Sequence, residues 1–312
     1  MKFMEYTIEQ ETFEKLAAEI AQLKQERNAV ILAHYYQRPE IQDVADYIGD
    51  SLQLSQLAAS AEAEVIVFCG VHFMAESAAI LSPDKIVLLP EERAGCPMAE
   101  MVDAESLRKR KEELPGVQVV CYVNSSAAVK AESDICCTSS NAAKIVRSLP
   151  EGEILFVPDV NLGKYLARTI ERPMHFWPGY CNTHDHVRRE DILKARQQYP
   201  EAKVIVHPEC REEVWQEADY VGSTAGLLAY AQHSEAKEFI VGTESGILHQ
   251  LDKIPGKKFY LASQQLICPN MKSTTLAKVR DALRDLTPRI TVSEDIRQKA
   301  AMALDRMMEA SK

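Results

Sequence analysis

Three segments of this chain repeat one pattern of residue types, and this repeat constrains the fold more than any other feature. The segments start at Val30, Gln118 and Lys203 with the apolar runs VILAHYY, QVVCYVN and KVIVHPE. When His34, Tyr122 and His207 are aligned, an acid follows 12 residues later and a hydroxyl 17 residues later. The acids are Asp46, Asp134 and Asp219, and the hydroxyls are Ser51, Ser139 and Thr224. Fixed-period similarity of this kind indicates duplicated supersecondary units.

Each copy alternates apolar strands with helices, which is typical of parallel sheets covered on both faces. In the first copy we predict strands at 30–36, 47–50, 64–69 and 86–90, with helices at 39–46, 51–62 and 73–81. Helices at 8–27, 101–114 and 189–199 precede the three copies, and two helices close the chain. We therefore predict an α/β protein of three pseudo-threefold-related αβα units. Their boundaries are 1–97 for unit 1, 98–182 for unit 2, and 183–312 for unit 3 with the C-terminal helices.

Composition excludes several classes of protein. The longest apolar runs fall short of the roughly 20 residues that a membrane helix needs, and the acidic N-terminus has no signal-peptide core. The net charge of -10 argues against a nucleic-acid partner, and we interpret the basic run RKRKEE at Arg108 as the solvated face of a helix. We expect a soluble cytoplasmic protein with no membrane partner.

The repeated polar residues fall at the predicted carboxyl ends of strands, where open α/β sheets bind ligands. His34, Tyr122 and His207 occupy one repeat position, and Tyr36, Asn124 and Glu209 follow two residues later. Because one position carries different chemistry in each copy, we expect the three copies to surround one asymmetric small molecule.

Two readings remain open for Ser51, Ser139 and Thr224, which each precede a predicted helix. They are ordinary N-caps, or they mark helix N-termini aimed at an anion.

Three of the eight cysteines also occupy equivalent points of the repeat: Cys96, Cys181 and Cys268. Three converging thiolates can hold a four-iron four-sulfur cluster and leave its fourth iron without a protein ligand. The competing reading is a Cys3His zinc site that uses His184, three residues after Cys181. For the other cysteines, which lie in or beside strands, we expect inert packing: Cys69, Cys121, Cys136, Cys137 and Cys210.

From about Asn28 to Lys272 the chain resembles the quinolinate synthase family. The motifs that carry the resemblance are AHYYQRPEIQDVADYIGDSLQLS, AGCPMAEM, YVNSSAAVKAESDICCTSSNA, PGYCNTHDHV, VHPECREEV, GTESGILH and CPNMKSTTL. The resemblance implies three units around a central [4Fe-4S] cluster, one per chain, with an open iron that acts as a Lewis acid. It places Cys96, Cys181 and Cys268 on the cluster ligands.

The resemblance also implies the reaction, which condenses iminoaspartate with dihydroxyacetone phosphate to give quinolinate, phosphate and water in NAD biosynthesis. The enzyme that produces iminoaspartate is then a candidate partner. The implied substrate contacts are His34, Ser51, Tyr122, Asn124, Ser139, His207, Glu209 and Thr224, with Tyr36 and His184 in the active-site region.

For catalysis we predict that Glu209 and Tyr36 transfer protons and that His34 and His207 orient carboxylates. We expect negative surroundings and partial burial to raise the pKa of Glu209 toward neutrality. A structural alternative is that Glu209 caps a helix or pairs with Arg211. Two other functions remain: a non-catalytic iron-sulfur sensor, and a different cluster-dependent hydro-lyase acting on a di- or tricarboxylate.

Overall fold

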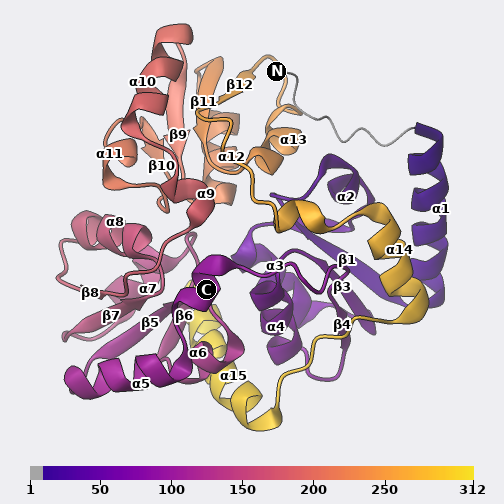
Figure 1. The fold of residues 1–312 in the computed structure, drawn as a ribbon, viewed down its shortest axis with the longest axis horizontal. Helices are drawn as coiled ribbons and strands as arrows, with labels where there is room; N and C mark the ends of the chain where they lie inside the picture. The colour runs from indigo at the N-terminus through magenta and orange to yellow at the C-terminus, as the bar shows by residue number, and fades with distance from the viewer. Residues whose placement is uncertain (1–9) are drawn as a thin grey trace.

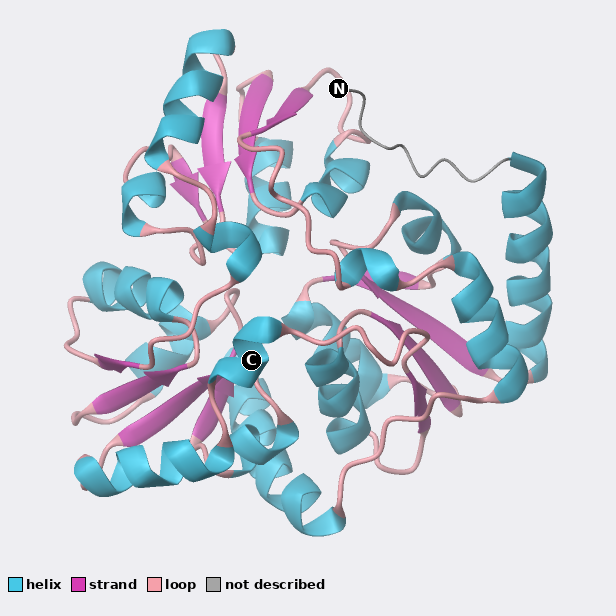
Figure 2. Ribbon diagram, viewed as in Figure 1, coloured by secondary structure: helices cyan, strands magenta, loops and turns pink. Residues whose placement is uncertain are grey.

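The computed structural model describes residues 10–312 and contains three four-stranded parallel sheets. Figures 1 and 2 show the sheets arranged around a common centre, each with helices on its faces. The strand orders are β2-β1-β3-β4, β6-β5-β7-β8 and β10-β9-β11-β12, so the topology is the same in all three. The predicted α/β class and the threefold repeat of parallel-sheet units are confirmed.

Unit 1 shows why its strands read as continuous apolar runs. Along β1, Ile31 and Ala33 pack in one apolar cluster, while Val30 and Leu32 pack in another, so both faces of the strand are covered. The elements are α1 (Gln10–Glu26), β1 (Ala29–His34), α2 (Pro39–Val44), β2 (Tyr47–Gly49), α3 (Ser51–Ser60), β3 (Val65–Cys69), α4 (His72–Leu81) and β4 (Ile86–Leu88).

Unit 2 follows the same order after a short 3-10 turn that starts next to Cys96. The turn includes Met101, and Asp103 caps the helix predicted at 101–114, so that helix begins at Ala104 instead. The elements are η1 (Pro97–Met101), α5 (Ala104–Glu113), β5 (Gln118–Tyr122), α6 (Ala127–Ala131), β6 (Ile135–Cys137), α7 (Ala142–Ser148), β7 (Ile154–Val157), α8 (Val160–Ile170) and β8 (His175–Phe176).

Unit 3 repeats the arrangement, with α10 before its first strand as α1 and α5 precede theirs. Its apolar core forms two clusters of its own, whereas units 1 and 2 share one large cluster. The elements are α9 (Asn182–Asp185), α10 (Arg189–Gln198), β9 (Lys203–Val206), α11 (Glu212–Trp215), β10 (Tyr220–Val221), α12 (Thr224–His233), β11 (Glu238–Gly242), η2 (Ser245–Ile247), α13 (Leu248–Leu251) and β12 (Lys258–Leu261).

The acid that recurs in each copy has a structural role. Each one directly precedes the second strand of its unit and accepts the N–H of a residue in the first strand. Asp46 accepts from Ile31 at 2.7 Å, Asp134 from Val119 at 2.7 Å, and Asp219 from Val204 at 2.8 Å. The carboxylate satisfies an amide that the short second strand does not reach, because a buried N–H without a partner is costly.

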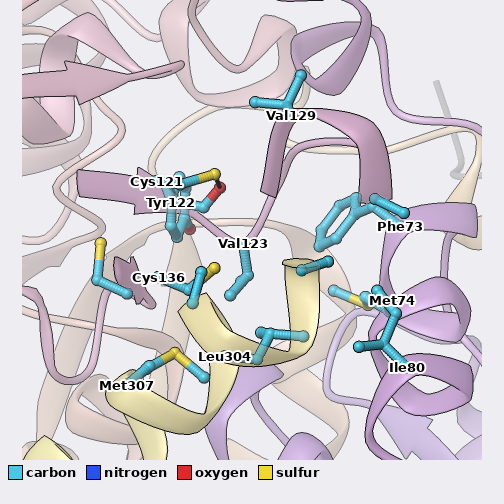
Figure 3. Packing of buried hydrophobic residues seen from close by; sticks show 14 of the residues in the cluster. Phe73, Met74, Ile80, Cys121, Tyr122, Val123, Val129, Cys136, Leu304 and Met307 are labelled. Atoms are coloured by element: carbon cyan, nitrogen blue, oxygen red, sulfur yellow. Dashed lines mark hydrogen bonds between the residues drawn. The ribbon is translucent and has the colours of Figure 1, made fainter. Parts of the chain in front are cut away.

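The closing segments η3 (Met271–Ser273), α14 (Leu276–Asp285) and α15 (Glu294–Ser311) lead the chain back to the first two units. Helix α14 packs on α1 and β3, and α15 packs on α4, α6, α7 and β6. Figure 3 shows Leu304 and Met307 of α15 next to Val123 and Cys136 of unit 2. The sequence division grouped these helices with unit 3, but their packing partners belong to units 1 and 2.

Helix α15 begins after Ser293, whose side chain makes no capping hydrogen bond. None of the helices in residues 10–312 combines the length and the apolarity that a membrane crossing requires.

Candidate active site

One cavity of about 140 Å³ collects residues from all three units, where the carboxyl ends of β1, β5 and β9 meet. Every residue predicted for the site borders this cavity. They are His34, Tyr36, Ser51, Cys96, Tyr122, Asn124, Ser139, Cys181, His184, His207, Glu209, Thr224 and Cys268. The repeat therefore brings these side chains together as the sequence indicated.

The Glu209 carboxylate lies among three other side chains that line the cavity. Its Oε1 accepts a 2.6 Å hydrogen bond from the Tyr122 hydroxyl, and its Oε2 lies 2.8 Å from His184 Nδ1 and 3.8 Å from His207 Nδ1. Burial alone would raise the pKa of Glu209, but His207, His184 and the hydrogen bonds from His184 and Tyr122 together lower it below its usual range.

The expected rise in the pKa of Glu209 is therefore wrong. Donors from two units surround the group, rather than the negative charges that the sequence suggested. The alternative pairing with Arg211 is not found either, because Arg211 Nη2 donates to Asp185 at 2.5 Å.

His34 and His207 are neutral donors placed at equivalent points. Burial lowers the pKa of each imidazole to about 3. His34 Nδ1 accepts the Tyr36 N–H at 3.1 Å, and His207 Nδ1 accepts the Glu209 N–H at 3.3 Å. The proton of each neutral ring is thus on Nε2. In His207 that nitrogen lies 3.2 Å from Ser139 Oγ, in the cavity wall.

A chain of hydrogen bonds joins Tyr36 of unit 1 to unit 3. The Tyr36 hydroxyl lies 2.8 Å from Thr224 Oγ1 and 2.6 Å from Thr243 Oγ1, and Thr243 Oγ1 lies 2.9 Å from His184 Nε2. Burial and the charge of Glu209 raise the pKa of Tyr36 well above its usual value, so the phenol keeps its proton. Sequence reasoning missed Thr243, because the equivalent positions hold Gly70 and Pro158 and no shared residue type marks the site.

The three repeated hydroxyls are not helix caps. Asp50 caps α3 through Leu52 N and Gln53 N, Ser223 caps α12 through Gly226 N, and Asn141 precedes α7. Ser51 and Thr224 are the first residues of their helices, and Ser139 lies in the turn before α7. The N-cap reading is wrong, and the hydroxyls border the cavity instead.

Asn124 offers a polar atom to a ligand. Its Oδ1 is buried and has no hydrogen-bond partner among residues 10–312. Buried polar atoms in folded proteins nearly always have partners, so an unpaired one beside a cavity indicates that a bound molecule supplies the donor.

The three candidate cysteines share one local structure. Cys96 and Cys181 directly precede the short turns η1 and α9, and Cys268 begins the Cys-Pro-Asn segment that leads into η3. Burial raises the pKa of Cys96 to about 12 and also raises the pKa of Cys181 and Cys268, and neighbouring cysteines add to the rise for Cys96 and Cys181. Three such thiols ionise together only with a cationic group between them. The remaining cysteines are fully buried, as predicted: Cys69, Cys121, Cys136, Cys137 and Cys210.

The spacing of the donors distinguishes a single ion from a cluster. Within residues 10–312, the only set of three donor atoms that all lie within 4.8 Å of one another comes from Cys181, His184 and Glu209. The three cysteine sulfurs do not form such a set, although a tetrahedral zinc ion with 2.3 Å bonds needs sulfurs about 3.8 Å apart. The wider cysteine triad fits a larger group better than it fits one ion.

Comparison with known proteins agrees with the motifs. The family model described as quinolinate synthetase A protein matches residues 18–309. A quinolinate synthase from Desulforudis audaxviator is 58% identical, over 95% of this chain and 98% of its own length. One from Methanosarcina barkeri is 56% identical, over 94% of this chain and 97% of its own.

A solved reductase structure from Plasmodium falciparum covers 88% of this chain and 84% of its own, at 12% identity and a TM-score of 0.32, which is too weak to bear on fold or function. The extent of the family match and the identity to its members decide the assignment: the chain belongs to the quinolinate synthase family.

Proposed function

We propose that this enzyme condenses iminoaspartate with dihydroxyacetone phosphate to form quinolinate, phosphate and water. The observation that carries the proposal is that three cysteines and polar residues of all three units border one buried cavity. Family membership supports the product, and the donors of the cavity suit two small anionic substrates.

Cys96, Cys181 and Cys268 would hold a [4Fe-4S] cluster by three of its irons. When bound, the cluster supplies a Lewis acid at the fourth iron, which polarises a substrate oxygen and helps hydroxide to leave.

The neutral imidazoles of His34 and His207 bind the carboxylates of the substrates through Nε2–H. Neutral donors suit this cavity for two reasons. They donate hydrogen bonds to an anionic substrate, and they add no buried positive charge that would pair with Glu209 instead of the substrate. Asn124 adds an amide, and Ser51, Ser139 and Thr224 add hydroxyls around the same space. Thr224 and Ser51 also start ten-residue helices, whose N-termini favour a phosphate or carboxylate.

Glu209 and Tyr36 divide the proton transfers. Glu209 is a carboxylate at neutral pH and takes protons from substrate carbon or nitrogen, and Tyr122 and His184 hold it in position. Tyr36 keeps its proton and donates it to a leaving oxygen, through a hydroxyl held by Thr224 and Thr243. The lowered pKa makes Glu209 a weak base, so its strength comes from position rather than from a pKa near 7.

The test is an anaerobic preparation of the protein assayed for iron, sulfide, zinc and quinolinate. We expect about four irons and four sulfides per chain, and quinolinate formation only when both substrates are present. Stoichiometric zinc without iron and sulfide would contradict the cluster and favour the Cys181–His184–Glu209 set. A full cluster without quinolinate formation would favour the hydro-lyase or the sensor. The cytoplasmic location and the partnership with the enzyme that produces iminoaspartate stay predictions.

A further inference from the structure

Two buried carboxylates hold the backbone of two of the three candidate cluster cysteines. Asp159 Oδ2 accepts the Cys181 N–H at 3.2 Å, and Glu244 Oε1 accepts the Cys268 N–H at 3.0 Å. Both acids are completely buried. They lie 37 residues after Tyr122 and His207 respectively, so they occupy the same position of the repeat.

Glu244 ties the whole Cys268 segment to units 1 and 3. Its Oε2 accepts the Gly246 N–H at 2.7 Å and the Lys272 ammonium at 3.0 Å. Lys272 in turn donates its ammonium to the Tyr36 carbonyl at 2.6 Å and its amide to the Cys268 carbonyl at 3.2 Å. The turn from Cys268 to Lys272 is therefore fixed at both ends.

Gly246 makes this arrangement possible. A Cβ at position 246 would lie 2.6 Å from the backbone carbon of Tyr36 and 2.8 Å from Lys272 Nζ. Only glycine allows the backbone of unit 3 to approach unit 1 so closely.

Asp159 holds the Cys181 segment in a comparable way. Its Oδ1 accepts the Leu162 N–H at 2.7 Å and so caps α8, which fixes the carboxylate relative to unit 2. Gly179, two residues before Cys181, pairs with Asp159 in an isolated parallel bridge. A Cβ on Gly179 would lie 2.6 Å from the Pro158 carbonyl oxygen, so the two segments are in close contact.

Unit 1 lacks the corresponding acid. The equivalent position holds Val71, a buried apolar residue. No hydrogen bond from the Cys96 amide is found within the described part of the chain. The support of the three cysteines is therefore unequal, with two held by carboxylates and one not.

We propose that Asp159 and Glu244 are positioning residues that place Cys181 and Cys268 for cluster binding, and that Cys96 is the least constrained ligand. The proposal rests on the cluster of the proposed function. A carboxylate suits this role because both of its oxygens accept, so one group can bind the cysteine amide and a second donor at once. Glu244 also pairs with the Lys272 ammonium beside the cluster site, so its replacement by a neutral amide leaves that cation unpaired and should raise the reduction potential of a bound cluster.

The experiment compares Glu244→Gln and Asp159→Asn with two matched controls, all as anaerobically purified full-length protein. Each amide variant keeps the shape but turns an NH2 group toward one of the donors that the carboxylate accepted. The controls are Asp219→Asn and Asp134→Asn, which remove carboxylates that accept a strand amide in units 3 and 2. The readouts are iron and sulfide content, the rate of cluster loss to a chelator, and the midpoint potential.

We expect Glu244→Gln and Asp159→Asn to lose the cluster at least five-fold faster than the parent, while both controls lose it at the parent rate. The potential of Glu244→Gln moves to a more positive value and that of Asp219→Asn does not. Parent protein without iron and sulfide would contradict the proposed cofactor itself. A parent with a full cluster, and with four variants that all keep it or all lose it equally, would overturn the positioning role alone.

Amide hydrogen exchange of the parent protein tests the proposal without a substitution, so the test does not depend on whether a variant folds. Measured by mass spectrometry with residue-level fragmentation, the Cys181 and Cys268 amides should exchange at least ten-fold more slowly than the Cys96 amide. Equal exchange at the three cysteines would overturn the unequal support.

Discussion

The Tyr122 hydroxyl donates a 2.6 Å hydrogen bond to the Glu209 carboxylate, and this bond joins unit 2 to unit 3 inside the cavity. Glu209 also contacts His184, which follows Cys181 by three residues. The same carboxylate is thus linked to a tyrosine at the end of β5 and to the segment of a cluster cysteine. Its ionisation and its position depend on the assembly of at least two units.

Glu209→Gln tests the proton-transfer role. The amide keeps the size of the side chain but cannot accept a substrate proton, so we expect kcat to fall by about 10²–10⁴ with the cluster retained. Steady-state quinolinate formation and iron content give the two measurements. The matched control is Glu212→Gln, on α11, which removes an exposed carboxylate paired with Arg168 and should leave kcat unchanged. If the kcat of Glu209→Gln lies within a few-fold of the parent value, Tyr36 becomes the leading candidate for the residue that transfers protons.

Replacing the cysteines separates cluster ligands from packing residues. We expect Cys96→Ala, Cys181→Ala and Cys268→Ala to contain less than a tenth of the parent iron and sulfide. Cys69→Ala and Cys210→Ala remove fully buried thiols that are not part of the cavity lining, so the iron content of these variants should match that of the parent. A parent-like cluster in any of the first three variants argues against that ligand.

Two neighbouring hydroxyl residues at the start of α12 make a matched pair of variants: Ser223, which caps the helix, and Thr224, which borders the cavity. Ser223→Ala removes the hydrogen bond to the Gly226 amide and should lower the free energy of unfolding by about 1 kcal/mol with little kinetic effect. Thr224→Ala should instead lower kcat/KM by more than ten-fold, because Thr224 holds the Tyr36 hydroxyl and faces the cavity. Ser139→Ala should behave like Thr224→Ala. An unchanged kcat/KM in both Thr224→Ala and Ser139→Ala would show that these hydroxyls do not take part in substrate binding or catalysis.

We predict that the contribution of Asp219 to the free energy of unfolding depends on pH. Partial burial would raise the pKa of Asp219, but Lys203, the Val204 amide and Arg196 lower it below the model-peptide value of 3.8. Because the folded pKa is the lower one, the stabilisation is complete above about pH 4 and is lost as the pH falls through the folded value. Asp219→Asn should therefore cost about 1 kcal/mol at pH 7, because solvent screens this partly exposed carboxylate, and progressively less below pH 4, as measured by urea unfolding. A cost that does not change with pH would contradict the ionised role.

The repeat allowed most of the fold and the cavity lining to be predicted from the sequence. Both depend on local patterns of residue types that recur in each copy. The strands are continuous apolar runs, and the acids Asp46, Asp134 and Asp219 mark the same hydrogen bond in each copy. Once three copies share a topology, the ends of β1, β5 and β9 carry their polar residues to corresponding places.

What the sequence did not predict depends on contacts between units. The pKa of Glu209 is lowered by His207, by His184 and by Tyr122 of unit 2, and of these three only His207 lies near position 209 in the sequence. Thr243 likewise acts through Tyr36, 207 residues away. The caps were misassigned by one residue at Ser51 and Thr224, because Asp50 and Ser223 are equally good capping residues and only backbone geometry distinguishes them. The acids Asp159 and Glu244 were missed although the repeat does mark them.

The position of α15 has a consequence for how the protein is made. The strands of unit 2 lie between Gln118 and Phe176, yet one face of this unit is covered by residues 294–311, with Arg306 bonded to the Asp134 carbonyl and Asn141 bonded to Ser311. On the ribosome, unit 2 stays uncovered while the whole of unit 3 is synthesised. Chaperone binding to nascent chains should therefore persist at unit 2 until α15 emerges, later than the synthesis of Cys268 and Met271, which complete the lining of the cavity.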